Sequence, residues 1–98
     1  MALDDAREKL YRAVKTLAIT DSDIKSRLTA ACVNELMHIN PENDLPDHLR
    51  EKFYQLHLQL TAQGSTPETI AYMTTREASS AAAEVVSLYE QIVNESSE

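Results

Sequence analysis

Apolar residues recur at spacings of three and four along four stretches of this chain, and such spacing is typical of amphipathic helices. The stretches cover residues 3–18, 23–38, 46–63 and 67–94. Short polar connections separate them, so consecutive helices are expected to pack as antiparallel neighbours. The sequence therefore predicts an all-α fold, an antiparallel four-helix bundle. We expect a single helical domain over residues 1–95 and a frayed tail at 96–98.

The connection before the last stretch carries the clearest helix-boundary signals. Gly64, the single glycine of the chain, fits the left-handed residue that follows a helix end. Pro67 suits the first helical position if Thr66 is the cap, whereas Ser65 and Glu68 have the spacing of a capping box. Both alternatives place the start of the helix within one residue.

From residue 67 the chain has no further glycine or proline, so it is expected to form the longest helix, about 42 Å if unbroken to residue 94. The favoured interpretation is one continuous helix. The alternative is a break near 74–77, because Thr74 and Glu77 have the spacing of a second capping box.

The apolar arc of this last helix is wide, about 160°, where a helix at the corner of a bundle usually shows little more than 100°. One interpretation is a central helix that contacts the other three. The favoured interpretation, because of the helix length, is that its second flank docks a symmetry mate or another protein. That flank supplies four candidate interface residues, which are Ala82, Val86, Tyr89 and Val93.

A second candidate interface lies on the 46–63 helix. Tyr54 and Leu58 are four residues apart and project away from the predicted core face. An isolated exposed leucine is ordinary, but a tyrosine and a leucine together on a face expected to be polar form a small contact patch.

The net charge is −7 and is unevenly distributed. Residues 1–40 carry six basic and six acidic groups, whereas residues 41–98 carry three basic and ten acidic groups. Nucleic-acid binding is disfavoured, because it requires a surplus of Lys and Arg to neutralise phosphates. The acidic excess suggests an alternative function, in which the protein is a decoy or inhibitor of a basic nucleic-acid-binding protein.

Composition argues against several other function classes. The single cysteine, Cys32, excludes a disulfide framework within one chain and falls on an apolar helix face. We find no nucleophile elbow, glycine-rich phosphate loop or zinc-ligand spacing, so no enzyme activity, cofactor or small-molecule substrate is expected. No apolar run approaches the length of a membrane span and the N-terminus lacks a signal peptide, so we expect a cytoplasmic protein without membrane contact.

One pattern with metal-binding chemistry remains. Glu35 and His38 have the Glu-x-x-His spacing found in di-iron helical bundles, and on a continuous helix they would share one face. A complete site needs a second such pair and two further glutamates, which this chain does not supply by itself. A small metalloprotein is therefore kept as an alternative, and no metal site is predicted.

The sequence thus favours a small acidic helical protein that acts in protein–protein interaction or regulation. We expect a homodimer or a complex with a protein partner, with Tyr54, Leu58, Ala82, Val86, Tyr89 and Val93 as interface residues.

Overall fold

The computed structural model describes residues 2–96, and within that range the chain forms helices without a β-strand. The prediction of an all-α fold is confirmed. The elements are α1 (Ala2–Ile19), α2 (Ile24–Asn34), the 3₁₀ turn η1 (Leu36–His38), α3 (Pro41–Asp44), α4 (Asp47–Leu60), α5 (Thr66–Tyr72) and α6 (Thr75–Ser96). Of the predicted tail at 96–98, residues 97 and 98 lie outside the described range.

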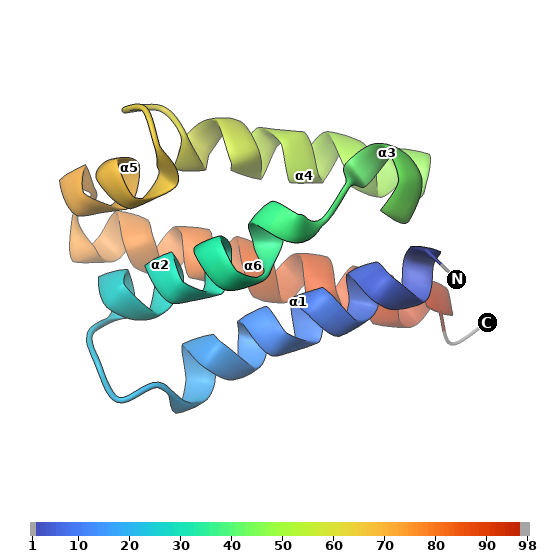
Figure 1. Cartoon of the computed structure of the whole chain (residues 1–98), viewed down its shortest axis with the longest axis horizontal. Coiled ribbons are helices and arrows are strands. Elements are labelled where there is room, and N and C mark those ends of the chain that lie inside the picture. The colour runs from blue at the N-terminus through green and yellow to red at the C-terminus, as the bar shows by residue number, and fades with distance from the viewer. Residues whose placement is uncertain (1, 97–98) are drawn as a thin grey trace.

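The four longer helices alternate in direction along the long axis of the molecule (Figure 1). α1 and α4 run one way, while α2 and α6 run back beside them. α6 packs against α1, α2 and α4, whereas α5 packs against α2 and α4. α6 therefore contacts each of the other three longer helices.

The core consists of one cluster of buried apolar side chains contributed by every longer helix. Its fully buried large members include Leu10, Leu28, Leu49, Ile70, Leu88 and Ile92. The buried residues of α1 and α4 recur at spacings of three and four, as predicted for these stretches: Ala6, Leu10, Ala13 and Leu17 on α1, and Leu49, Phe53, Leu56 and Leu60 on α4. Ala13 is small, which lets a neighbouring helix approach closely.

The last predicted helix is two helices, so the favoured continuous helix is wrong and the alternative break is confirmed. The chain leaves helical geometry at Met73, whose ψ is 148°, and Thr74 then caps α6. The Thr74 backbone N–H donates to Glu77 Oε1 at 2.8 Å, and the Glu77 N–H donates to Thr74 Oγ1 at 3.0 Å. This reciprocal pair is a capping box, which satisfies donors that an interrupted helix would leave free.

Ser65 and Glu68 form the capping box predicted at the start of α5. Ser65 is therefore the cap, and Pro67 is the second helical residue. Gly64 has φ +115°, the left-handed region expected for it. However, α4 already ends at Leu60, and the Gly64 N–H donates to the Thr61 carbonyl at 3.1 Å. The glycine therefore closes the turn after α4, where the prediction had placed it directly at the helix end.

The second predicted helix, 23–38, is also shorter than expected. α2 ends at Asn34, and residues 36–38 tighten into the 3₁₀ turn η1. Leu36 in η1 and Ile39, the extended residue that follows η1, are both buried in the core. None of the helices between residues 2 and 96 combines the length and apolar character needed to cross a membrane.

Candidate interaction surface

The α6 flank that was predicted to dock a partner lies mostly against α1. Ala82 is only 8% exposed and belongs to the core. Tyr89 is half-buried, and its ring centroid lies 6.1 Å from that of Tyr11 on α1. Val93 is also half-buried, which leaves Val86, 37% exposed, as the main open apolar residue of this flank. The wide apolar arc of α6 thus largely reflects its central position in one chain.

The α4 patch is open but lies among polar groups. Leu58 is 64% exposed and shares a surface hollow with Glu51, Lys52 and Glu84. Tyr54 lies one turn earlier, and its hydroxyl donates to Glu42 Oε2 at 2.5 Å. This hydrogen bond raises the pKa of Tyr54 above its ordinary value, because ionisation of the phenol would place two negative charges together. Tyr54 therefore already has a polar partner within the chain.

The Glu35 and His38 pair does not share a helix face. Glu35 follows the last residue of α2, with φ −124°, and His38 ends η1. The His38 carbonyl accepts a hydrogen bond from Lys9 Nζ at 3.1 Å, which ties this turn to α1. Within residues 2–96, no three His, Cys, Asp or Glu side chains come close enough together to hold a metal ion. The structure therefore adds no support to the metalloprotein alternative.

Helix α2 and the turn after it carry a row of small and apolar residues that are exposed or half-buried. The row consists of Ser26, Ala30, Val33 and Met37, spaced by four, three and four residues. Within α2, Ser26, Ala30 and Val33 return to the same side of the helix, opposite the buried face formed by Leu28, Ala31 and Cys32. Met37 lies beyond the end of α2, in η1. Val33 is 38% exposed and Met37 is 60% exposed. We call these four residues the α2 stripe.

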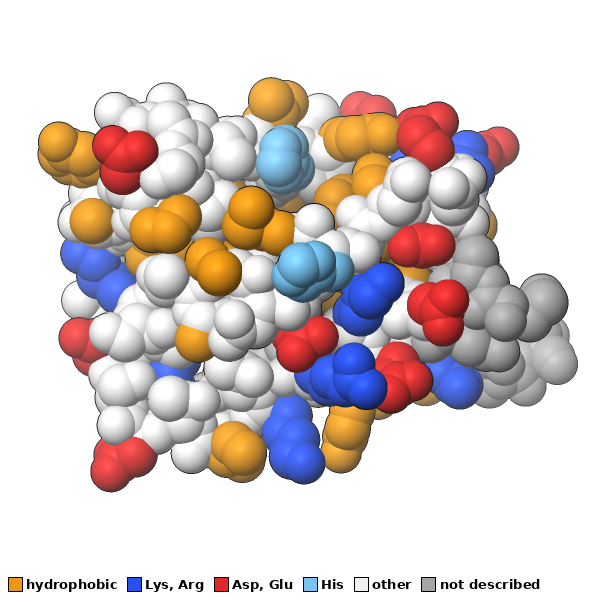
Figure 2. Space-filling model, viewed as in Figure 1, with side chains coloured by type: hydrophobic (Ala, Val, Ile, Leu, Met, Phe, Trp, Pro, Cys, Tyr) orange, Lys and Arg blue, Asp and Glu red, His pale blue; other side chains and the backbone are white. Residues whose placement is uncertain are grey.

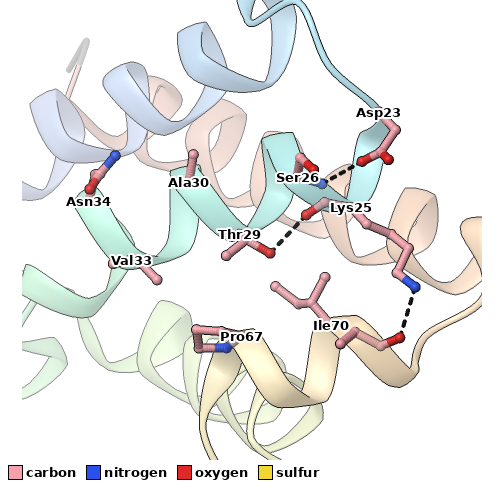
Figure 3. Close-up of a pocket in the computed structure, with 10 residues that line it drawn as sticks. Asp23, Lys25, Ser26, Thr29, Ala30, Val33, Asn34, Pro67 and Ile70 are labelled. Carbon is pink, nitrogen blue, oxygen red and sulfur yellow. Dashed lines mark hydrogen bonds between the residues drawn. The ribbon is translucent and has the colours of Figure 1, made fainter.

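An open groove of about 770 Å³ runs between the α2 stripe and α5. From α2 it is lined by Ser26, Ala30 and Val33, and from α5 by Pro67 and Ile70. Figure 3 shows Val33, Pro67 and Ile70 converging on the space between the two helices. Ile70 is buried, so it forms the floor of the groove. Figure 2 shows hydrophobic side chains gathered over α2 and α5 on this face of the molecule.

The groove is nearly neutral. Among the described residues that line it, Asp23 and Lys25 carry charge, and their charges are opposite. Asp23 caps α2 by accepting the Ser26 N–H at 2.8 Å, and this hydrogen bond is the main cause of its lowered pKa. Lys25 Nζ donates to the Ala71 carbonyl at 2.9 Å, which ties α2 to α5. Both charged groups are therefore held in place at one end of the groove.

A separate cavity of about 20 Å³, roughly the room of one water molecule, lies between α2, η1 and α4. Cys32, Met37 and His57 line it together with leucines of α4. Burial raises the pKa of the Cys32 thiol to about 12, because the thiolate would be poorly solvated there. At neutral pH this thiol stays protonated, which makes it a packing residue, as its apolar helix face suggested.

Sequence reasoning missed the α2 stripe. Its signal, small and apolar residues at the same spacing as a helix seam, is present in the sequence at Ser26, Ala30, Val33 and Met37. The signal was hard to recognise because the buried face of α2 has the same kind of spacing. Only the packing of α2 against α1, α5 and α6 shows which of the two faces remains open.

Comparison with protein-family models, curated proteins and solved structures gave no match for this chain.

Proposed function

We propose that this protein acts by binding another protein chain through the α2 stripe and its groove. The observation that carries the proposal is the open groove between α2 and α5, whose apolar part is lined by Ala30, Val33, Pro67 and Ile70. Exposed apolar patches mark sites at which proteins, membranes or ligands bind. The proposal keeps the class of function expected from the sequence and moves the interface from α6 to α2.

Burial and charge support this choice over the two surfaces expected from the sequence. Ala82 and Tyr89 already pack within the chain, and Leu58 is flanked by Glu51, Lys52 and Glu84. Removing such charges from water on binding carries a desolvation cost that the α2 groove largely avoids.

The architecture is part of the same proposal. We infer that α1, α2, α4 and α6 constitute a four-helix bundle, and that α3, η1 and α5 are short additions to it. The alternating directions of the four helices in Figure 1 support this inference. In this arrangement α5 lies beside α2 and builds the second wall of the groove.

Two matched valine variants test the proposal. Val33 and Val86 are 38% and 37% exposed, and they lie on different faces. Val33→Asp places a carboxylate in the groove and is expected to abolish co-purification of protein partners from native lysate, including a second, differently tagged copy. Val86→Asp introduces the same charge at equal exposure and is expected to leave binding unchanged.

The outcomes separate the alternatives. Loss of binding with Val86→Asp alone would return the interface to the α6 flank. Binding that neither variant changes, and that weakens steeply with salt, would favour the acidic decoy, because exposed charge contacts are screened by salt. If the Val33→Asp variant still binds its partners, the proposed function is contradicted, whatever Val86→Asp does.

A further inference from the structure

We propose that helix α5 is a hinged cover, which swings away from α2 as one unit and uncovers the thiol of Cys32. This inference goes beyond the proposed function, because it concerns a movement of the chain itself and requires no partner. α5 lies at one end of the molecule, between the turn that follows α4 and the start of α6 (Figure 1).

Both ends of α5 have the properties of a hinge. Gly64, immediately before the cap of α5, has φ +115°, and Met73, immediately after its last helical residue, has ψ 148°. Residues at the ends of helices absorb the backbone rotation when a segment moves, and glycine does so over the widest range of φ. A change of backbone angles at these two positions therefore reorients α5 without unwinding it.

The two capping boxes leave this movement free. Ser65 pairs with Glu68 inside α5, and Thr74 pairs with Glu77 inside the first turn of α6. Each box joins residues three apart in sequence, so neither connects α5 to another helix. Both boxes can therefore stay intact while α5 changes its orientation.

Few hydrogen bonds hold α5 in place. Within the described residues 2–96, two of them join its helical residues to the chain outside the segment 65–73. Lys25 Nζ donates to the Ala71 carbonyl at 2.9 Å, and the Gln63 N–H donates to Thr69 Oγ1 at 3.0 Å. Opening of the cover breaks these two bonds and leaves the hydrogen bonds of α2 and α4 unchanged.

α5 also buries little apolar surface. Its buried residues are Thr66, Thr69 and Ile70, so Ile70 is its one large apolar anchor, whereas Tyr72 is 77% exposed. α4 buries four large apolar side chains, which are Leu49, Phe53, Leu56 and Leu60. Hydrophobic stabilisation grows with the apolar area removed from water, so displacing α5 requires less free energy than displacing α4. Opening of α5 alone is thus a lower-energy event than global unfolding.

The cover closes the cavity beside Cys32. Thr66, in the first turn of α5, forms part of the wall of this cavity, and the other walls belong to α2, η1 and α4. Cys32 is 1% exposed in the closed structure. Removal of Thr66 connects the cavity with solvent, and Ile70 leaves the floor of the α2–α5 groove in the same movement.

The rate at which an aromatic disulfide reagent labels Cys32, the single thiol of the chain, measures this opening. The thiolate is the reactive form, and burial raises the pKa of Cys32 to about 12, so the closed protein reacts slowly. In the wild type we expect labelling to change little at low urea, because opening of α5 exposes little surface. Labelling through global unfolding would instead rise about fivefold per molar urea, and such a rise would overturn the inference.

Two matched isoleucine variants separate the cover from the core. Ile70 in α5 and Ile92 in α6 are 1% and 0% exposed, so Ile70→Ala and Ile92→Ala make the same truncation at equal burial. Ile70→Ala removes the anchor of the cover and is expected to speed labelling about tenfold or more. Ile92→Ala weakens the core away from α5 and is expected to leave labelling without urea within about twofold of wild type. Equal acceleration by both variants would show that labelling requires global unfolding, and the inference would fail.

A surface variant completes the test if Ile70→Ala does not fold, which circular dichroism detects. Lys25→Met removes the hydrogen bond to the Ala71 carbonyl without changing the core and is expected to speed labelling about threefold. Lys15→Met, at an exposed position of α1, is the matched control and is expected to label like wild type. Equal rates for the two lysine variants would contradict the role of α5 as the cover of Cys32.

Discussion

Helices α2 and α6 both carry more apolar surface than one packing contact needs, yet they use it differently. α6 is central, and its extra flank is largely covered by α1, where Tyr89 packs near Tyr11. α2 lies at the surface, and its second stripe remains open at Val33 and Met37. A wide apolar arc therefore does not identify a partner surface by itself. What decides is on which sides of the helix the fold places its neighbours, because α2 and α6 each pack against three other helices.

The largest expected effect is a loss of free energy of unfolding in a variant of the buried face of α6, compared with a variant of the exposed α2 stripe. Leu88→Ala in α6 should lower the free energy of unfolding by about 2–5 kcal/mol, because Leu88 is 2% exposed and its truncation leaves a cavity. Met37→Ala should change it by less than about 0.5 kcal/mol, because Met37 is 60% exposed. Urea unfolding, at a concentration at which the chain is monomeric, measures both. Comparable losses in the two variants would contradict the contrast between the helices.

A smaller effect is expected at the start of α6. Thr74→Ala removes the side-chain acceptor of the capping box with Glu77 and should cost about 1 kcal/mol. Thr75→Ala, at the adjacent exposed first helical residue, is the matched control. Thermal melting followed by circular dichroism compares the two. Equal stability of Thr74→Ala and wild type would mean that the break between α5 and α6 does not depend on this cap.

The smallest effect concerns the cap of α2. The pKa of Asp23 is lowered from 3.8 in the folded chain, chiefly by the hydrogen bond from the Ser26 N–H. Its contribution to stability is therefore present above pH 3.8 and is lost as the pH falls through the lowered folded-state value. Asp23→Asn keeps a capping side chain that does not titrate.

Stability measured against pH should therefore fall more steeply for wild type than for Asp23→Asn below that pH. Parallel profiles would show that the charge of Asp23 does not stabilise α2.

Much of the fold was predictable because local physics specified it. The stripes of α1 and α4, the positive φ of Gly64 and the box at Ser65 and Glu68 depend on residues close in sequence. The sequence also contains the capping-box spacing of Thr74 and Glu77 before α6. A continuous helix was nevertheless favoured over the break that this spacing indicates. The end of α2 at Asn34 was missed, because the chain leaves α-helical geometry at Glu35 and passes through η1 to the cap of α3 at Asn40.

The candidate site was the least predictable part. By itself the sequence determined the helical class, the buried faces and most helix starts, because periodicity and caps act within a few residues. Only the tertiary structure decided that Ala82 is buried, that Tyr89 is half-buried and that Val33 and Met37 are exposed. Which apolar face of a helix remains open depends on helices distant in sequence, and only their packing determines where those helices lie.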